Sequence, residues 1–308
     1  MRARYPRPLD DGTLACDYKR GLVELARKGG RMYRAISMAA LLLAAGALAP
    51  GQSAAELLDQ AEGLLATRYL PENLRSAIDL YERALALSPQ DTALMTKLAQ
   101  LWYELGITAE DKASSRRAFQ RGADLGFSAL GFEGLGEVQK TPAEGFEGRV
   151  SQSENVAALY WSAKCWGMLV DTGGLSAQLN AIFTGMPAKV RALYLAAIAL
   201  DETYFGGGPH EDYGALLVNF TRFHLYGATL EEAKAHFDRA IEIASGAGYL
   251  IPFVTYAEQY AVRAGDRALF EDLLRHVLQA PIGDWPFWNR IAKEKAQELL
   301  SQADRLFR

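Results

Sequence analysis

The stretch NLRSAIDLYERALALSPQD, residues 73–91, decides the fold class. Its apolar side chains recur at intervals of three and four residues, which places them on one face of a helix, and charged residues occupy the other face. Ala77, Tyr81 and Ala84 follow the spacing small-x3-aromatic-x2-small, in which small residues let two helices approach and the ring fills the gap between hairpins. Pro89 ends the pattern. The stretch therefore predicts an amphipathic helix that packs within a helical hairpin.

The same spacing returns elsewhere in the chain, so we interpret it as an internal repeat. The second copy consists of Ala233, Phe237 and Ala240, and a weaker third copy consists of Ser115, Phe119 and Gly122. Thr229 and Glu232 form a capping box before the second copy. Tetratricopeptide repeats place alanine, an aromatic residue, alanine and proline at this spacing in their second helix. The sequence predicts an all-α fold of degenerate tetratricopeptide-like hairpins stacked into a solenoid.

Most of the remaining chain also has a helical pattern. Further helices are expected at residues 93–106, 154–170, 189–205, 250–265 and 266–278, and a terminal capping helix with one polar face at residues 289–307. The helix at 189–205 is apolar nearly all round, so we expect it to be central. Residues 126–148 are rich in glycine and phenylalanine and are expected to form an ordered loop or a partner-facing insert. No stretch alternates at period two, which predicts essentially no sheet.

The first 55 residues differ from the rest and predict export. Ala35 to Ala49 is an apolar run of 15 residues after basic residues, shorter than the ~20 residues of a membrane span and typical of a signal peptide. We expect the signal to begin at Met32 and to be cleaved after Ala55, with an uncleaved anchor as the alternative. No cysteine follows the apolar run, so a lipoprotein is not expected. The predicted domains are residues 1–55, extension and signal, and residues 56–308, one all-α domain in the periplasm without a stable transmembrane segment.

Charge and cysteine content narrow the possible functions. The whole chain has a net charge of −4, and removal of residues 1–55 leaves 24 basic and 33 acidic residues, a net charge of −9. No window combines clustered Lys and Arg with interleaved aromatic residues, so no nucleic-acid partner is predicted. Cys165 alone remains after cleavage, which excludes an intrachain disulfide. We interpret Cys165 as a small buried hydrophobic residue.

The stretch DETYFGGGPHEDYG, residues 201–214, is the candidate site. It lacks the Lys-Ser/Thr of a phosphate-binding loop and the G-x-G-x-x-G of a dinucleotide site. A helix stop, with Gly206 left-handed and Pro209 preventing the helix from resuming, explains one glycine and the proline. It does not explain three glycines among Tyr204, Phe205 and Tyr213. We therefore expect this stretch to contact a partner or ligand, and expect Gly207→Val to reduce that binding more than thermal stability.

Metal and catalytic signals are absent from the sequence. His210, Glu211 and Asp212 are adjacent, and adjacent loop side chains rarely converge on one ion. The other histidines, His224, His236 and His276, are isolated in sequence. No H-E-x-x-H or G-x-S-x-G motif occurs. The sequence predicts no cofactor, no metal and no enzyme. The alternative is an envelope enzyme or enzyme accessory acting on cell-wall material, with Glu211 and Asp212 as acid and base.

Several motifs together carry a family resemblance. LDETYFGGGP (200–209), a following helix of the form A-x3-F-x2-A-I, YWSAKCWG (160–167) and YAEQYAV (256–262) resemble the T-component (TatT) family of tripartite ATP-independent periplasmic (TRAP) transporters over about residues 58–280. The resemblance implies a non-enzymatic periplasmic scaffold that self-associates, a trimer among the options, and docks the solute-binding component of a TRAP transporter. Family members are often lipoproteins and tend to carry a basic residue after Gly-Gly-Pro, where this chain has His210.

The expected contact residues follow from the glycine stretch and the resemblance. Partner or small apolar ligand contacts are expected at Tyr204, Phe205, Gly206, Gly207, Gly208, Pro209 and Tyr213, with Trp161 and Trp166 as wall residues of a groove. Ordinary core packing is the alternative for both tryptophans. A general tetratricopeptide adaptor unrelated to transport is a further alternative for the chain as a whole.

Overall fold

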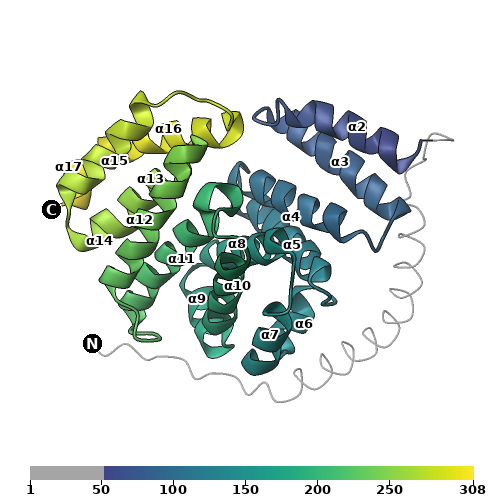
Figure 1. Ribbon diagram of the computed structural model, residues 1–308, viewed down its shortest axis with the longest axis horizontal. Coiled ribbons are helices and arrows are strands. Elements are labelled where there is room, and N and C mark those ends of the chain that lie inside the picture. Colours follow the sequence, from purple (N-terminus) through teal and green to yellow (C-terminus); the bar gives the residue numbers. More distant parts are fainter. Residues whose placement is uncertain (1–51) are drawn as a thin grey trace, which may run out of the picture. The chain divides into compact units, whose positions relative to one another are not determined.

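The stretch that predicts the fold lies in α3 (Pro71–Leu87) of the computed structural model, which describes residues 52–308 (Figure 1). Ala77 and Ala84 are fully buried and Tyr81 nearly so, which confirms that the motif faces the core. α3 packs against α2 (Ala54–Leu65) and α4. The Tyr81 hydroxyl donates a hydrogen bond to the Glu62 carboxylate of α2 and so connects the two helices of the first hairpin.

The second hairpin consists of α4 (Thr92–Ile107) and α5 (Lys112–Ala129). α4 confirms the helix predicted at 93–106, and the Asp91 and Asp111 carboxylates cap the two helices by accepting backbone N–H bonds. Phe119, the ring of the weaker motif copy, is fully buried. A Cβ atom at Gly106 would lie 2.4 Å from this ring, so the glycine is what lets α4 and α5 pack closely.

Residues 126–148 are mostly helical, so the prediction of a loop was wrong. α5 continues to Ala129, and two short helices follow, α6 (Leu135–Lys140) and α7 (Ala143–Val150). The buried rings of Phe127, Phe132 and Phe146 pack together with centroids 5.4 to 6.2 Å apart. The phenylalanines thus form core, and only two of the region's glycines, at positions 131 and 134, take positive φ at a turn.

The centre of the described part is α8 (Val156–Asp171), which was predicted at 154–170. It packs against α4, α5 and α10, and every residue from Ala158 to Trp166 is buried. α9 (Gly174–Phe183) follows and leads into α10 (Met186–Asp201). α10 was expected to be central, but this prediction was wrong, because one of its faces leaves Leu195 and Leu200 exposed.

The second motif copy lies in the hairpin of α11 (Tyr204–Phe223) and α12 (Leu230–Ala247), where Ala233, Phe237 and Ala240 are fully buried. The helix predicted at 250–265 is interrupted by a π-helical turn. Its parts are α13 (Ile251–Thr255), η1 (Tyr256–Ala261) and α14 (Val262–Ala264).

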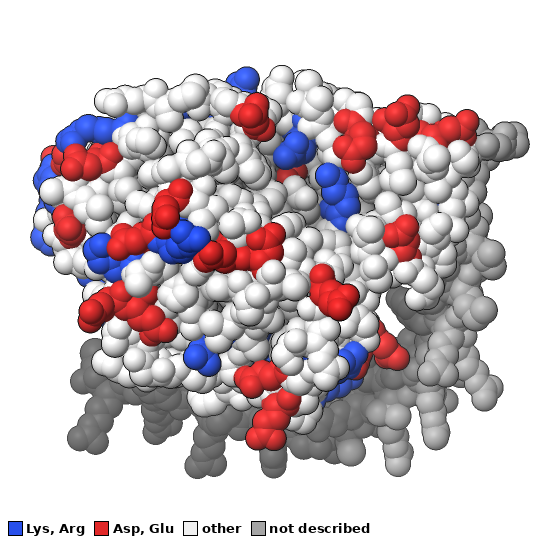
Figure 2. Space-filling view, in the orientation of Figure 1, with Lys and Arg blue, Asp and Glu red and all other residues white. Residues whose placement is uncertain are grey.

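The C-terminal helices are α15 (Arg267–Gln279), α16 (Pro286–Ser301) and α17 (Ala303–Leu306). α16 buries Ala292, Ala296 and Leu299 on one face and leaves charged residues on the other, as expected of a terminal helix with one wet face. The region that the structure describes contains no strand, which confirms the all-α prediction of packed helical hairpins. On the face shown in Figure 2, acidic and basic side chains lie interspersed among large uncharged areas.

The compact unit begins at Ser53 and ends at Arg308. Ser53 forms a capping box at the start of α2, in which its hydroxyl accepts from the Glu56 N–H and the Glu56 carboxylate accepts from the Ser53 N–H. Residues 1–51 of the predicted extension and signal lie outside the described residues. A cut after Ala55 would fall within the first turn of α2.

Candidate functional site

The junction between α10 and α11 reverses the chain through three consecutive left-handed residues. The φ values are 52°, 65° and 85° at Phe205, Gly206 and Gly207. Gly206 is left-handed as expected, although α10 already ends at Asp201. Helical geometry resumes at Gly208, and Pro209 lies in the first turn of the new helix, where its missing N–H costs no hydrogen bond. The expectation that Pro209 prevents the helix from resuming was therefore wrong.

Each glycine of the run admits a different neighbour. A Cβ atom at Gly206 would lie 2.9 to 3.1 Å from the Tyr249 side chain, and one at Gly207 would lie 3.0 Å from the Ala240 carbonyl oxygen of α12. A Cβ atom at Gly208 would lie 2.5 Å from the Tyr160 hydroxyl of α8. Close packing against these neighbours thus explains why all three positions are glycine, which the helix-stop interpretation did not explain.

The left-handed turn directs the Phe205 ring into a cluster of aromatic side chains. Its ring centroid lies 4.9 Å from that of Trp161 and 5.0 Å from that of Trp285, both nearly edge-on. Trp288 and Tyr249 follow at 5.5 and 5.6 Å. Phe205 has a left-handed backbone conformation that non-glycine residues rarely adopt and that costs free energy. The contacts of its ring within the aromatic cluster must offset this cost.

A surface groove reaches this cluster at Tyr204. The Trp161 indole N–H donates to the Tyr204 hydroxyl at 3.0 Å, which fixes both side chains at the base of the groove. The groove has a volume of about 320 Å³ and is lined by Ala93, Thr96, Lys97, Gln100, Asn155, Ala157, Trp161 and Tyr204. The lining combines apolar surface with polar groups from α4 and α8, as expected of a surface that binds a partner.

The other predicted contact residues are not accessible. Gly206, Gly207, Gly208, Pro209 and Tyr213 are buried, and Phe205 is only partly exposed within the aromatic cluster. Trp166 is buried against Phe127 at a centroid distance of 5.6 Å and lines none of the grooves described for residues 52–308. Trp161 is fully buried as well, so Tyr204 is the predicted site residue whose partly exposed side chain lines a groove, and the glycine run acts by positioning Tyr204.

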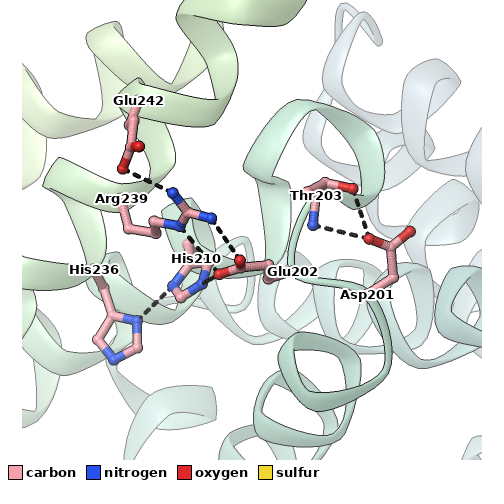
Figure 3. A network of polar contacts seen from close by, with 7 residues as sticks. All are labelled: Asp201, Glu202, Thr203, His210, His236, Arg239 and Glu242. Carbon is pink, nitrogen blue, oxygen red and sulfur yellow. Dashed lines mark hydrogen bonds and ion pairs between the residues drawn. The ribbon is translucent and has the colours of Figure 1, made fainter.

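A polar network ties the glycine turn to α12 (Figure 3). Glu202 accepts from Arg239 at 2.5 and 3.1 Å, and Arg239 also bonds to Glu242 at 2.8 Å. The His210 Nε2 atom lies 3.0 Å from the Glu202 carboxylate, and its Nδ1 atom lies 2.8 Å from Nδ1 of His236. Because a carboxylate only accepts, His210 Nε2 donates to it, and in the neutral pair His236 Nδ1 donates to His210.

The pKa values of Glu202, His210 and His236 are all lowered, that of Glu202 by hydrogen bonds and those of the two histidines by burial. The hydrogen bond from Arg239, with that from His210, lowers the pKa of Glu202 to about 2. Burial, with the neighbouring His210, lowers the pKa of His236 to about 4, and burial also lowers that of His210. Both rings are therefore neutral at neutral pH. Sequence reasoning treated His236 as isolated, and its spacing from His210 gave no signal of the pair.

Glu211 and Asp212, the alternative acid–base pair, turn to different partners. The Asp212 carboxylate forms an ion pair with Lys164 at 2.7 Å, and Glu211 accepts from the Thr255 hydroxyl at 2.6 Å just before η1. Burial, with the nearby Asp212 charge, raises the pKa of Glu211 to about 7. The Glu211 side chain is buried, and one of its oxygens has no hydrogen-bond partner among the described residues.

A narrow pocket of about 130 Å³ reaches Lys164 and Asp212 but is not lined by Glu211. The two carboxylates consequently do not converge on one accessible reaction site. Within residues 52–308, no group of three or more His, Cys, Asp or Glu side chains is placed to hold a metal ion.

Comparison with known proteins gives one family match. A sequence profile described as TRAP transporter T-component matches residues 65–307, nearly the whole of the described part. No curated protein matches the chain.

Proposed function

The chain belongs to the TRAP transporter T-component family, and we propose that it is a non-enzymatic periplasmic scaffold that docks the solute-binding component of a TRAP transport system. The family membership supports a role in TRAP transport. The single observation that carries the docking surface is the groove of about 320 Å³ at whose base Tyr204 and Trp161 are hydrogen-bonded.

The groove suits recognition of a protruding side chain. Tyr204 offers a partly exposed aromatic ring that is held by the buried Trp161, and aromatic anchors in pockets carry much of the binding energy of protein interfaces. Beside Tyr204, the Asn155 side-chain amide donates to the Thr96 hydroxyl at 3.2 Å, which orders the polar side of the groove. The left-handed turn at Gly206 and Gly207 holds Tyr204 in place, so the partner meets a preorganised surface. The same aromatic base fits a small apolar ligand.

The periplasmic location and self-association are further parts of the proposal. The predicted signal within residues 1–55 supports export. The homo-oligomer is inferred from the family, whose members the sequence resembles. A general adaptor of the same fold would share the groove but would not bind a TRAP solute-binding protein, so the identity of the partner separates the two functions.

The groove can be tested with a matched pair of substitutions. Ala93 is exposed on α4 and lines the groove, so Ala93→Arg obstructs it without disturbing the core. Ala86 is equally a surface alanine, on α3 away from the groove, and Ala86→Arg is the control. In a titration against the TRAP solute-binding protein of the same cell, Ala93→Arg should weaken binding at least about tenfold, as expected for an obstructed anchor. Equal affinity of the two variants would contradict the assignment of the groove.

The raised pKa of Glu211 is the one observation that favours the second candidate, an envelope enzyme. Loss of an envelope hydrolytic activity in Glu211→Gln, with a melting temperature no lower than that of the unaltered protein, would support the enzyme. The scaffold predicts no such activity in the unaltered protein.

A further inference from the structure

α9 presents an apolar face to solvent. Leu175, Leu179 and Phe183 are 68%, 45% and 86% exposed, and their spacing of four residues places them on one side of the helix. Residues 172–188 contain no charged side chain. Apolar side chains with such large exposed fractions protrude from the surface and do not line a cavity. The apolar face of α9 therefore differs from the surfaces of α4 and α10, which line grooves.

The opposite side of α9 fixes its orientation. α9 packs against α8 and α10, and Ala181 is buried on that side. Within residues 52–308 no single helix is long and apolar enough to cross a membrane, whereas α9 and α10 together pass that test of length and composition with a bend of 80° between them. The bend prevents one straight span, so the apolar face of α9 remains at the surface of the folded unit.

The Arg116 side chain of α5 lies between the end of α8 and the start of α9. Arg116 donates from Nη1 to the Leu169 carbonyl oxygen at 2.9 Å, and a Cβ atom at Gly173 would lie 2.7 Å from the same nitrogen. Arg117 is exposed on α5 and lines one surface hollow together with Arg116 and Leu169. In the part of the chain that the structure describes, Arg116 and Arg117 form no ion pair, whereas the nearby Arg121 is paired with Glu82.

We propose that α9 inserts its apolar face into the surface of an anionic lipid bilayer. The inserted side chains are Leu175, Leu179 and Phe183, and the cations facing the headgroups are Arg116 and Arg117. An apolar helix face beside unpaired basic residues is the pattern of interfacial membrane binding, and the basic charges complement anionic lipid. The net charge of −9 after residue 55 does not oppose this, because exposed charges beyond roughly 8 Å are screened at physiological salt.

This inference goes beyond the docking function and uses a different surface. The groove at Tyr204 is lined from α4 and α8, and none of its lining residues lies on α9. Membrane contact would hold the scaffold beside a membrane-bound transporter, but the two proposals can fail separately.

Flotation with lipid vesicles tests the inference. The full chain and the compact unit Ser53–Arg308, which contains the whole described core, are compared in parallel, because the apolar run at 35–49 could itself bind lipid. The unit is expected to float with vesicles of equal parts phosphatidylglycerol and phosphatidylcholine. Phe183→Ser should weaken binding by about tenfold or more, since burial of a Phe side chain contributes at least that much. Phe223→Ser, at a phenylalanine 48% exposed on α11, is the matched control and should bind as the unaltered unit does.

Substitution of a basic residue provides a second, independent test of the proposed membrane contact. Arg117→Glu should weaken binding to the anionic vesicles by about fivefold or more and leave binding to pure phosphatidylcholine unchanged. A polarity-sensitive dye on Phe183→Cys should shift to the blue when anionic vesicles are added. Cys165 is the other cysteine of Ser53–Arg308 and is fully buried, so labelling is confined to position 183.

Three results would overturn the inference. The first is a folded unit that does not float with anionic vesicles, and the second is an equal loss in Phe183→Ser and Phe223→Ser. The third is a change of oligomeric state in Phe183→Ser without lipid binding in the unaltered unit, which would assign the face to a second copy of the chain. Binding to the solute-binding component is unaffected by any of these outcomes.

Discussion

Replacement of Gly207 by alanine tests the interpretation of the glycine run most sharply. Gly207 has a φ of 85°, and a left-handed conformation costs an alanine about 1–2 kcal/mol. Its Cβ atom would also lie 3.0 Å from the Ala240 carbonyl oxygen and 3.2 Å from Cβ of Ile243, so α12 would have to move. Overpacking of this kind adds about 1–3 kcal/mol. Gly207→Ala should therefore destabilise the fold by about 2–5 kcal/mol, and Gly207→Val by more.

The matched control is Gly248→Ala. Gly248 has a φ of 66° at the end of α12, but a Cβ atom there would meet nothing within 4 Å, so only the backbone cost of about 1–2 kcal/mol applies. Thermal melting followed by circular dichroism should show a decrease of about 5–15 °C for Gly207→Ala and about 2–6 °C for Gly248→Ala. Equal decreases would refute the role of the close approach to α12. Because Gly207 is buried, its substitution is now expected to act mainly on stability, and on partner binding only through the position of Tyr204.

The remaining predictions concern the buried polar groups near the turn. Lys164→Met leaves Asp212 without its ion-pair partner and should cost about 3–5 kcal/mol in urea unfolding, whereas Lys234→Met, at an exposed pair, should cost no more than about 0.5 kcal/mol; similar losses would contradict the buried pair. Glu211 has a folded pKa of about 7, above its unfolded value, so its contribution to stability is present below about pH 4.5 and is lost as pH rises through 7. Glu211→Gln should therefore gain stability relative to the unaltered protein between pH 5 and pH 8, and parallel pH profiles would show that Glu211 does not titrate in this range. Tyr160→Phe removes a buried hydroxyl that has no hydrogen-bond partner among the described residues. It should therefore lower the free energy of unfolding by at most about 1 kcal/mol, as checked by the melting temperature.

The helices were predictable because their signals are local. In α3 and α12 the alternation of apolar and charged residues at helical spacing determines which face is buried, and the structure confirms it. α10 shows where local pattern is insufficient. Its sequence is apolar nearly all round, but whether a neighbour covers each face depends on how many helices pack there, and Leu195 and Leu200 remain exposed. The phenylalanines at 127, 132 and 146 were misassigned to a loop because their mutual contacts join α5, the turn that follows it and α7.

The candidate site was predictable in position but not in accessibility. The sequence marked residues 204–209 as unusual, and the structure places the unusual backbone there. Burial of the glycines depends on Tyr249, Ala240 and Tyr160. These residues are distant from the glycines in sequence, and no sequence pattern links them to the turn. The contact between His210 and His236 is non-local in the same way, since the two residues belong to facing helices 26 positions apart.

Direct titration of the protein with the solute-binding component of a TRAP transporter from the same cell is the most direct test of the proposed scaffold function. The docking proposal predicts saturable binding that Ala93→Arg weakens and Ala86→Arg leaves unchanged. Absence of binding by the folded protein, at concentrations where its helical spectrum and cooperative melting are intact, would contradict it.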